Sequence, residues 1–130
     1  MQNLASITLV VKDYDEAIKY YTTVLNFSLL EDTRMSESKR WVKVAPPGAT
    51  NGFDLLLAKA VGKEQESRIG NQTGGRVFLF LHTDDLLRDH QNLLRHNVNI
   101  IRGPLEEKYG KVLVFEDLYG NLWDLIQPNS

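Results

Sequence analysis

The strongest constraint on the fold is an order of predicted elements that occurs twice along the chain. In the first half, SITLVV (6–11) predicts a strand, and YDEAIKYYTTVL (14–25) predicts an amphipathic helix from its apolar residues at three- and four-residue spacing. In the second half, VFLFLH (77–82) and LLRDHQNLLRH (86–96) repeat the strand and the helix. Strand-like segments follow each helix. A duplicated unit of this kind cannot bury its apolar face alone, so two copies must share a core, within the chain or with a second chain.

The ends of the two predicted helices also match. Asp13 precedes the first helix, and Asp84 and Asp85 precede the second, where a carboxylate can accept hydrogen bonds from the first turn. Asn26 and Asn97 follow the helices, and asparagine tolerates the left-handed conformation that ends many helices.

The remaining segments complete each copy. Further strands are expected at 27–33, 40–47 and 53–60 in the first half and at 99–103, 111–117 and 122–127 in the second. We expect a single domain over residues 1–130, with one module over about 4–60, a polar, glycine-bearing linker over about 61–75 and a second module over about 76–128.

Composition excludes several classes of function. The chain has no cysteine, which excludes disulfides, thiolate metal sites and a cysteine nucleophile. Its net charge is -2 with lysine and arginine scattered among acids, so we expect no nucleic-acid partner and no anionic membrane partner. The N-terminal apolar run is too short for a signal peptide or a membrane span, and we expect a cytoplasmic protein.

Three motifs resemble a known superfamily. ITLVVKDYDEAIKYYTTVLNF (7–27), the turn DLYGN (117–121) and WDLI (123–126) are similar to the vicinal oxygen chelate superfamily, which includes glyoxalase I, bleomycin- and fosfomycin-resistance proteins and extradiol dioxygenases. The resemblance covers about residues 4–127. It implies an α+β fold in which two βαβββ modules form a curved, cup-like mixed sheet with helices on the outer face, usually completed as a homodimer.

The resemblance also implies a place for a metal. Enzymes of this superfamily typically hold a divalent ion with His, Glu, His or Gln, and Glu, and these positions fall on Ser6, Asp54, Phe78 and Asp124. Phe78 has no donor atom, and Ser6 is a poor ligand for zinc or nickel. Two carboxylates alone leave a divalent ion mostly hydrated. We therefore expect no cofactor, with a Zn, Ni, Mn or Fe ion on Asp54 and Asp124 as the alternative.

Strand alternation predicts which side chains share the cup. If Ser6 and Phe78 point inward, Thr8 follows the first, and Phe80 and His82 follow the second. Together with the two acids these residues would form a pocket for a flat or aromatic molecule, with apolar walls and few polar groups. The alternative is that Phe78 and Phe80 fill a cup that binds nothing.

Two residue types could move a proton. His82 is a candidate general base, because imidazole titrates near neutrality, but a surface histidine bonded to a capping acid explains it as well. Asp54 and Asp124 could share a proton, with Asp124 as a catalytic acid or base, or each could accept hydrogen bonds from a neighbouring strand.

Residues near the rim of the cup complete the candidates. Tryptophan is more often a core residue than a ligand contact, but Trp41 lies beside the charged Arg40 and Lys43, which would place it near the rim. The loops 45–52 and 104–110 are expected to border the cup. Arg102 and Tyr109 are therefore further candidate ligand contacts. The DLYGN turn is expected to be structural, because its Asp and Asn can bond the local backbone and its Gly can take positive φ.

These observations predict a glyoxalase/bleomycin-resistance-type homodimer that binds or sequesters a flat or aromatic organic ligand without a metal. The alternative is a metal-dependent glyoxalase I-like lyase, isomerase or dioxygenase that uses Asp54 and Asp124. A third possibility is a metal-free enzyme in which Asp124 or His82 moves a proton next to a carbonyl. Whether the protein is an enzyme stays open at this point, as does the pairing of the modules within one chain or between two.

Overall fold

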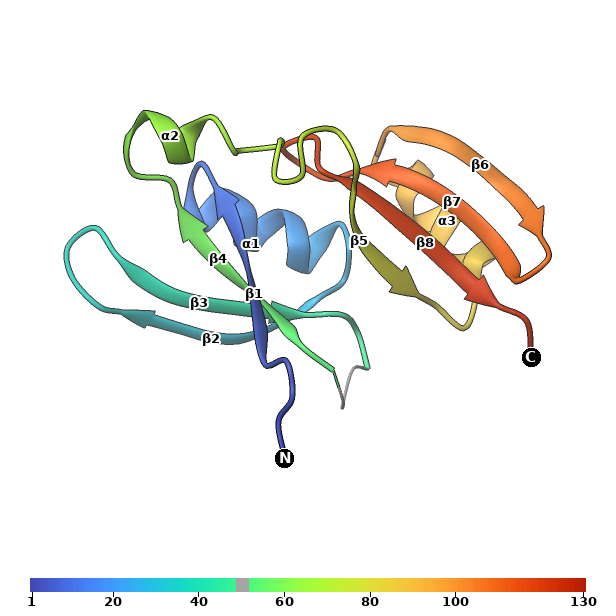
Figure 1. The fold of residues 1–130 in the computed structure, drawn as a ribbon, viewed down its shortest axis with the longest axis horizontal. Helices are drawn as coiled ribbons and strands as arrows, with labels where there is room; N and C mark the ends of the chain where they lie inside the picture. The colour runs from blue at the N-terminus through green and yellow to red at the C-terminus, as the bar shows by residue number, and fades with distance from the viewer. Residues whose placement is uncertain (49–51) are drawn as a thin grey trace. The chain divides into compact units, whose positions relative to one another are not determined.

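A computed structural model describes residues 1–48 and 52–130, so the predicted loop 45–52 lies partly outside the described residues. The chain divides into two compact units, Met1–Ile69 and Gly70–Ser130, which we call unit one and unit two. The elements are β1 (Ser6–Val11), α1 (Tyr14–Thr23), β2 (Ser28–Arg34), β3 (Arg40–Ala45), β4 (Asp54–Lys59), α2 (Gly62–Glu66), β5 (Val77–His82), α3 (Leu86–Arg95), β6 (Ile100–Glu107), β7 (Gly110–Glu116) and β8 (Leu122–Pro128) (Figure 1).

Both units have the same sheet topology. The strand orders are β1-β4-β3-β2 in unit one and β5-β8-β7-β6 in unit two, each with one parallel pair at the start of the order and antiparallel pairs after it. The prediction of an α+β fold built from two βαβββ copies is confirmed. The repeat predicted this because the same order of apolar periods folds in the same way twice.

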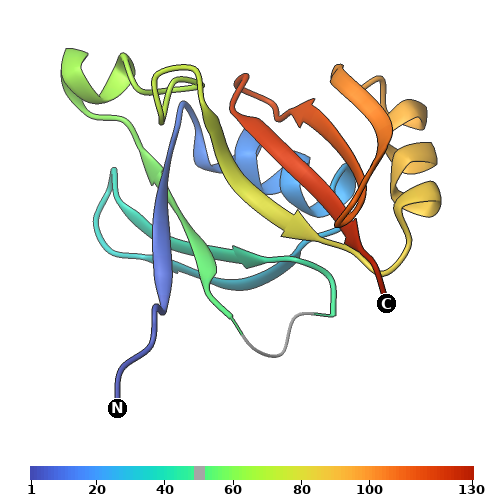
Figure 2. The same ribbon diagram turned by 45° about the vertical axis from the view of Figure 1, so that its right-hand side comes forward.

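In unit one, α1 packs on one face of the sheet (Figure 2). Asp13 caps the helix, as predicted, by accepting a hydrogen bond from the Glu16 backbone N–H at 2.8 Å. Asn26 ends it with a φ of 61°. The core contains side chains from α1 and from three strands, namely Ala17, Tyr21, Leu9, Val11, Val42, Val44, Leu55 and Leu57. These strand residues alternate with those that face away from α1.

In unit two, α3 packs on one face of the sheet in the same way. Asp85 accepts a hydrogen bond from the Arg88 backbone N–H at 3.0 Å, and Asn97 follows the helix with a φ of 57°. The buried residues on this face are Leu86, Leu93, Leu113, Phe115, Trp123 and Leu125. Phe115 and Trp123 stack with ring centroids 6.0 Å apart.

The structure differs from the prediction at two segments. The segment expected as a linker contains α2, a short helix without a buried residue, which its polar sequence did not indicate. Strand β6 continues to Glu107, where the sequence predicted a loop, because Glu106 and Glu107 pair with Lys111 and Gly110 across a tight turn.

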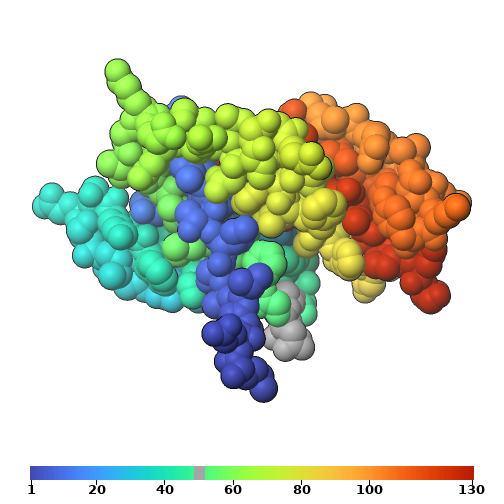
Figure 3. All heavy atoms as spheres, in the orientation of Figure 1, coloured from blue at the N-terminus to red at the C-terminus, as the bar shows by residue number. Residues whose placement is uncertain are grey.

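Strand β2 is exposed along its whole length, and both β2 and α2 lie at the molecular surface (Figure 3). Within the described residues, no helix is both long and apolar enough to cross a lipid bilayer.

Candidate functional site

Each unit has a sheet face opposite its helix, which we call the helix-free face. In unit one the strand residues that alternate with the buried core face this side, and they include Ser6, Thr8, Trp41, Lys43 and Asp54. In unit two the corresponding residues include Phe80, His82, Arg102, Val114 and Asp124. Most of the residues predicted from the sequence to line a site therefore lie on these two faces, one set in each unit.

On the helix-free face of unit one, Asp54 already has partners for both carboxylate oxygens. Ser6 is the residue directly opposite Asp54 in the β1–β4 pair, and its Oγ donates a hydrogen bond to Asp54 Oδ1 at 2.5 Å. The Lys43 ammonium lies 3.9 Å from Asp54 Oδ2 and 5.8 Å from the centroid of the Trp41 ring. Thr8 is exposed one alternation further along β1. The sequence prediction missed the role of Lys43, although its position two residues after Trp41 places both side chains on one face.

On the helix-free face of unit two, four residues form a row across the sheet. Arg102 pairs with Val114, Val114 pairs with Asp124, and Asp124 pairs with Phe80, so the row runs through β6, β7, β8 and β5. Asp124 is 8% exposed, whereas Phe80 at the end of the row is 66% exposed. An exposed aromatic ring therefore lies directly opposite a buried acid.

Asp124 differs from Asp54 in its surroundings. Burial raises the pKa of the Asp124 carboxyl, and the positive charge of Arg102 acts in the opposite direction. Asp124 Oδ1 is buried and has no hydrogen-bond partner among the residues that the structure describes. A buried acceptor in this state costs about 1–3 kcal/mol, so it marks a place where a donor is missing.

Phe78 does not lie where strand alternation predicted. The pairing of β5 with β8 shifts by one residue between Val77 and Leu79, so Phe78 is an extra residue in the strand. Its ring meets Trp123 edge-on, with centroids 6.4 Å apart and an interplanar angle of 87°. Because Trp123 belongs to the face toward α3, Phe78 and Phe80 do not share a face. The apolar run VFLFL (77–81) contains no signal for this shift, and a contact of Phe78 with a ligand stays a prediction.

His82 and Tyr109 lie at the margins. His82 is exposed opposite Ile126 at the end of β5, and the described residues give its imidazole no hydrogen-bond partner. The expected bond to a capping acid is absent there, since Asp84 pairs with Arg88 and Asp85 caps α3. Tyr109 is exposed in the turn between β6 and β7. The structure thus brings Phe80, Arg102 and Asp124 together, with His82 one alternation further along β5.

The donor atoms on the two faces do not fit a divalent metal. Among the described residues no group of three or more His, Cys, Asp and Glu side chains could hold a metal ion. Asp54 has a lysine ammonium beside it, and Asp124 lies in the field of Arg102. The lysine ammonium beside Asp54 opposes a second cation there, and the charge of Arg102 opposes one at Asp124 from a greater distance. The hydroxyl of Ser6 is a weak ligand for the metals that imidazole and carboxylate prefer.

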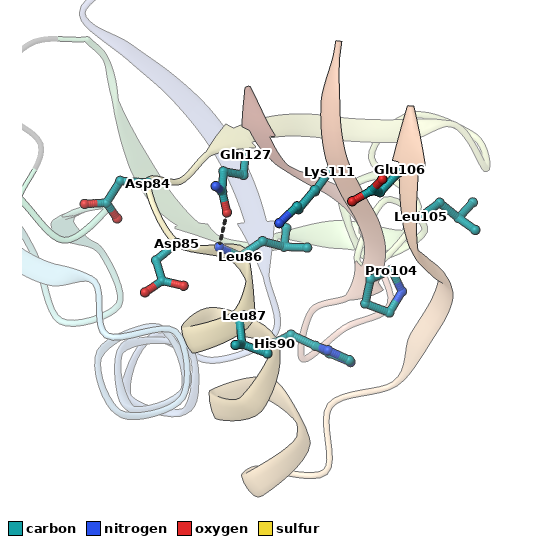
Figure 4. Close-up of a pocket in the computed structure, with 10 residues that line it drawn as sticks. All are labelled: Asp84, Asp85, Leu86, Leu87, His90, Pro104, Leu105, Glu106, Lys111 and Gln127. Carbon is teal, nitrogen blue, oxygen red and sulfur yellow. Dashed lines mark hydrogen bonds between the residues drawn. The ribbon is translucent and has the colours of Figure 1, made fainter. Parts of the chain in front are cut away.

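A separate pocket of about 560 Å³ lies on the other face of unit two, between the start of α3 and the β6–β7 hairpin (Figure 4). Leu87 and His90 of α3 face Glu106 and Lys111 across it, and Gln127 Oε1 accepts a hydrogen bond from the Leu86 backbone N–H at 2.8 Å. None of the residues predicted from the sequence to bind a ligand lines this pocket.

Comparison with known proteins gives the family. The family model of the Glyoxalase/Bleomycin resistance protein/Dioxygenase superfamily matches residues 3–125. An uncharacterized protein of Shewanella frigidimarina (strain NCIMB 400) is 57% identical over 130 residues, which cover 99% of this chain and 96% of that protein. The structure of UcmS2 matches with a TM-score of 0.82 at 24% identity, over 97% of this chain and 98% of the other. TnmS3, an antibiotic binding protein from Streptomyces sp. CB03234, matches with a TM-score of 0.77 at 28% identity, over 99% and 98% of the two chains. With a family match over nearly its whole length and a duplicated βαβββ fold, the chain belongs to the Glyoxalase/Bleomycin resistance protein/Dioxygenase superfamily.

Proposed function

We propose that the protein binds a flat, aromatic organic molecule on its helix-free faces and sequesters it, without a metal ion. The observation that carries this proposal is the exposure of Phe80, an aromatic ring 66% exposed in the middle of a strand and next to a buried acid. A ring of this kind offers a stacking surface, and aromatic pairs contribute about 0.5–1.5 kcal/mol beyond the area that they bury.

The helix-free face of unit one supports the same chemistry. Trp41 presents a second ring, and the Lys43 ammonium beside it can meet a polar substituent of a ligand. The polar groups are few and fixed, as in sites that recognise an apolar molecule by shape and orient it with a small number of contacts.

The family comparison supports binding as the role. TnmS3 is described as an antibiotic binding protein and is 28% identical to this chain over nearly its full length. Binding without chemistry also agrees with the donor set around Asp54 and Asp124, which is poor for a metal. We propose further that the protein acts as a homodimer in the cytoplasm, and light scattering after size-exclusion chromatography tests the dimer.

Titration with 2-methoxynaphthalene tests the binding role. Phe80→Ala removes the proposed stacking surface, and Leu87→Ala is a matched control because Leu87 is also 66% exposed but lies on α3. We expect Phe80→Ala to weaken binding about tenfold, equivalent to about 1.4 kcal/mol, and Leu87→Ala to leave it unchanged. Absence of binding by the wild-type protein, or equal binding by both variants, would overturn the proposal.

The metal-dependent enzyme is the rival reading and has its own test. Protein purified without chelator is analysed for bound metal and melted in the presence of Zn, Ni, Mn or Fe(II). A metal at a hundred times its dissociation constant would stabilise the fold by about 2.7 kcal/mol. Near-stoichiometric metal that is lost in Asp124→Ala would replace the binding role with metal-assisted chemistry. We expect no bound metal and no shift.

A further inference from the structure

The two duplicated acids give an internal comparison. Asp54 is the first residue of β4, and Asp124 is the third residue of β8. The two positions are equivalent in the repeat, and each acid has one directly paired neighbour on the parallel edge strand. For Asp54 this neighbour is Ser6, whose hydroxyl donates a hydrogen bond to Oδ1. For Asp124 the neighbour is Phe80, which has no hydrogen to donate. Unit two therefore has an aromatic ring where unit one has the donor.

The other neighbours of Asp124 do not supply the missing donor. Val114, its partner on β7, is apolar, and Ile126, the next residue of β8 on the same face, is apolar as well. Arg102 lies one strand beyond Val114, about 10 Å from β8 at the usual strand spacing, and no hydrogen bond joins it to Asp124 within the described part of the chain. Asp124 Oδ1 is therefore an acceptor without a donor among the described residues, in a residue that is 8% exposed.

Position and charge restrict what can fill the acceptor. Adjacent strands lie about 4.8 Å apart, so a ring stacked on Phe80 brings its edge within reach of the Asp124 carboxyl. Arg102 is a fixed positive charge on the same face and disfavours a cationic group there. A neutral O–H or N–H at the edge of an aromatic ring satisfies both conditions, and a carboxyl keeps an acceptor oxygen in either protonation state.

We propose that the ligand stacked on Phe80 carries a neutral O–H or N–H group that donates a hydrogen bond to Asp124 Oδ1, as the Ser6 hydroxyl does to Asp54. This inference rests on the proposed binding role, because Phe80 supplies the surface for the ring. It assigns Asp124 as the residue that determines which aromatic molecules are accepted. Buried groups that must be paired discriminate strongly against ligands that leave them unpaired.

A pair of probes that differ only in the donor tests the inference. 2-Naphthol has a hydroxyl where 2-methoxynaphthalene has a methyl ether, and the ether is the more apolar of the two. We expect the wild-type full-length protein to bind 2-naphthol about tenfold more tightly than the ether, which corresponds to about 1.4 kcal/mol. Asp124→Leu should reduce this ratio to about one.

A second variant provides the donor within the protein. Phe80→Ser copies the Ser6–Asp54 pair and should abolish the preference for the naphthol. Phe80→Leu is its control, because it removes the ring without adding a donor and should not abolish the preference. If Asp124→Leu fails to fold, Asp124→Asn serves instead, since a neutral amide oxygen accepts more weakly and should lower the ratio. A purely structural role of Asp124 predicts a lower melting temperature for Asp124→Leu, whereas a ligand-directed role predicts an equal or higher one.

The outcomes separate this inference from the binding role. Equal affinity of the wild-type protein for the two probes, with binding still dependent on Phe80, would overturn the hydrogen bond and leave the binding role in place. Tighter binding of protonated 2-naphthylmethylamine than of 2-naphthol would overturn the neutral donor in favour of a cation. Binding of neither naphthalene would overturn both.

Discussion

Arg102 and Asp124 face each other across Val114, with one strand between them on the helix-free face of unit two. Two opposing effects act on the acid. Burial raises the pKa of Asp124, and the guanidinium of Arg102 partly offsets this increase. Arg102 and Asp124 therefore form no salt bridge, although the charge of Arg102 acts on the acid. The native state is destabilised by a buried carboxyl whose Oδ1 lacks a donor among the described residues.

The raised pKa of Asp124 predicts a dependence of stability on pH. The native state holds the Asp124 proton above the ordinary pKa of 3.8, so the contribution of this group to stability is present below 3.8 and is lost as pH rises through the raised value. Asp124→Asn removes this dependence. We expect the melting temperature of the variant, relative to the wild type, to increase as the pH rises above 3.8 and then to level off. A difference that decreases with pH would contradict the assignment.

Asp117 is predicted to be the most sensitive polar residue of unit two. Its carboxylate is 6% exposed and accepts hydrogen bonds from the backbone N–H groups of Tyr119, Gly120 and Asn121, from Asn121 Nδ2 and from Trp123 Nε1 at 2.9–3.4 Å. Asp117→Ala leaves several of these buried donors without a partner. We expect a loss of about 3 kcal/mol in the free energy of unfolding, measured in urea. Glu107→Ala, an exposed acid on β6, is the control, and a loss below about 1 kcal/mol for Asp117→Ala would contradict the role of this turn.

The repeat explains how much of the fold could be predicted from sequence. Apolar periods and capping residues placed the strands and the two long helices, because helix caps such as Asp13 and Asp85 act locally. The asparagines after the helices were predicted for the same reason, and both adopt positive φ. Pairing between strands was harder to predict, because it depends on residues far apart in the chain.

The candidate site shows this limit most clearly. The sequence placed Phe78 in the cup together with Phe80, but the register shift in β5 pairs Phe80 with Asp124 and brings Phe78 against Trp123. Within one apolar strand, any register satisfies the hydrophobic pattern about equally, so tertiary packing of Phe78 against Trp123 decides. The contact of Lys43 with Asp54 is likewise a diagonal contact between strands.

Gly70 is predicted to tolerate no side chain. It has a φ of +72°, and a Cβ built on it would lie 1.8 Å from the backbone oxygen of Tyr119. Gly74 is a matched control, because its φ is +68° and a Cβ there meets nothing within 4 Å. Both alanine substitutions carry a left-handed penalty of about 1 kcal/mol, but Gly70→Ala must also displace the 117–121 turn. We expect Gly70→Ala to cost at least about 2 kcal/mol more than Gly74→Ala in urea unfolding, and equal losses would contradict the close approach.

The ion pair between Arg40 and Asp32 is predicted to stabilise unit one in a pH-dependent way. Arg40 Nε and Nη2 donate to the two Asp32 oxygens at 3.0 and 2.7 Å, and these hydrogen bonds lower the pKa of Asp32 below its ordinary value of 3.8. A lowered pKa means that the contribution is present above 3.8 and is lost as pH falls through the lower native value. Because the pair is partly exposed, Asp32→Asn should cost about 1 kcal/mol or less near pH 6, and this cost should decrease as the pH falls below 3.8.

Asp15→Asn separates this ion pair from the general loss of a charge. Asp15 is 81% exposed at its side chain and contacts Arg40 through Nη1 at 2.8 Å, so it pairs with the same guanidinium through one hydrogen bond only. We expect Asp15→Asn to cost less than half as much as Asp32→Asn, since a single exposed contact is weaker than a bidentate one. Thermal melts of the two variants and the wild type over a series of pH values measure both differences. Equal costs for the two variants, or a cost for Asp32→Asn that does not decrease as the pH falls below 3.8, would show that the two-point contact does not supply the stabilisation.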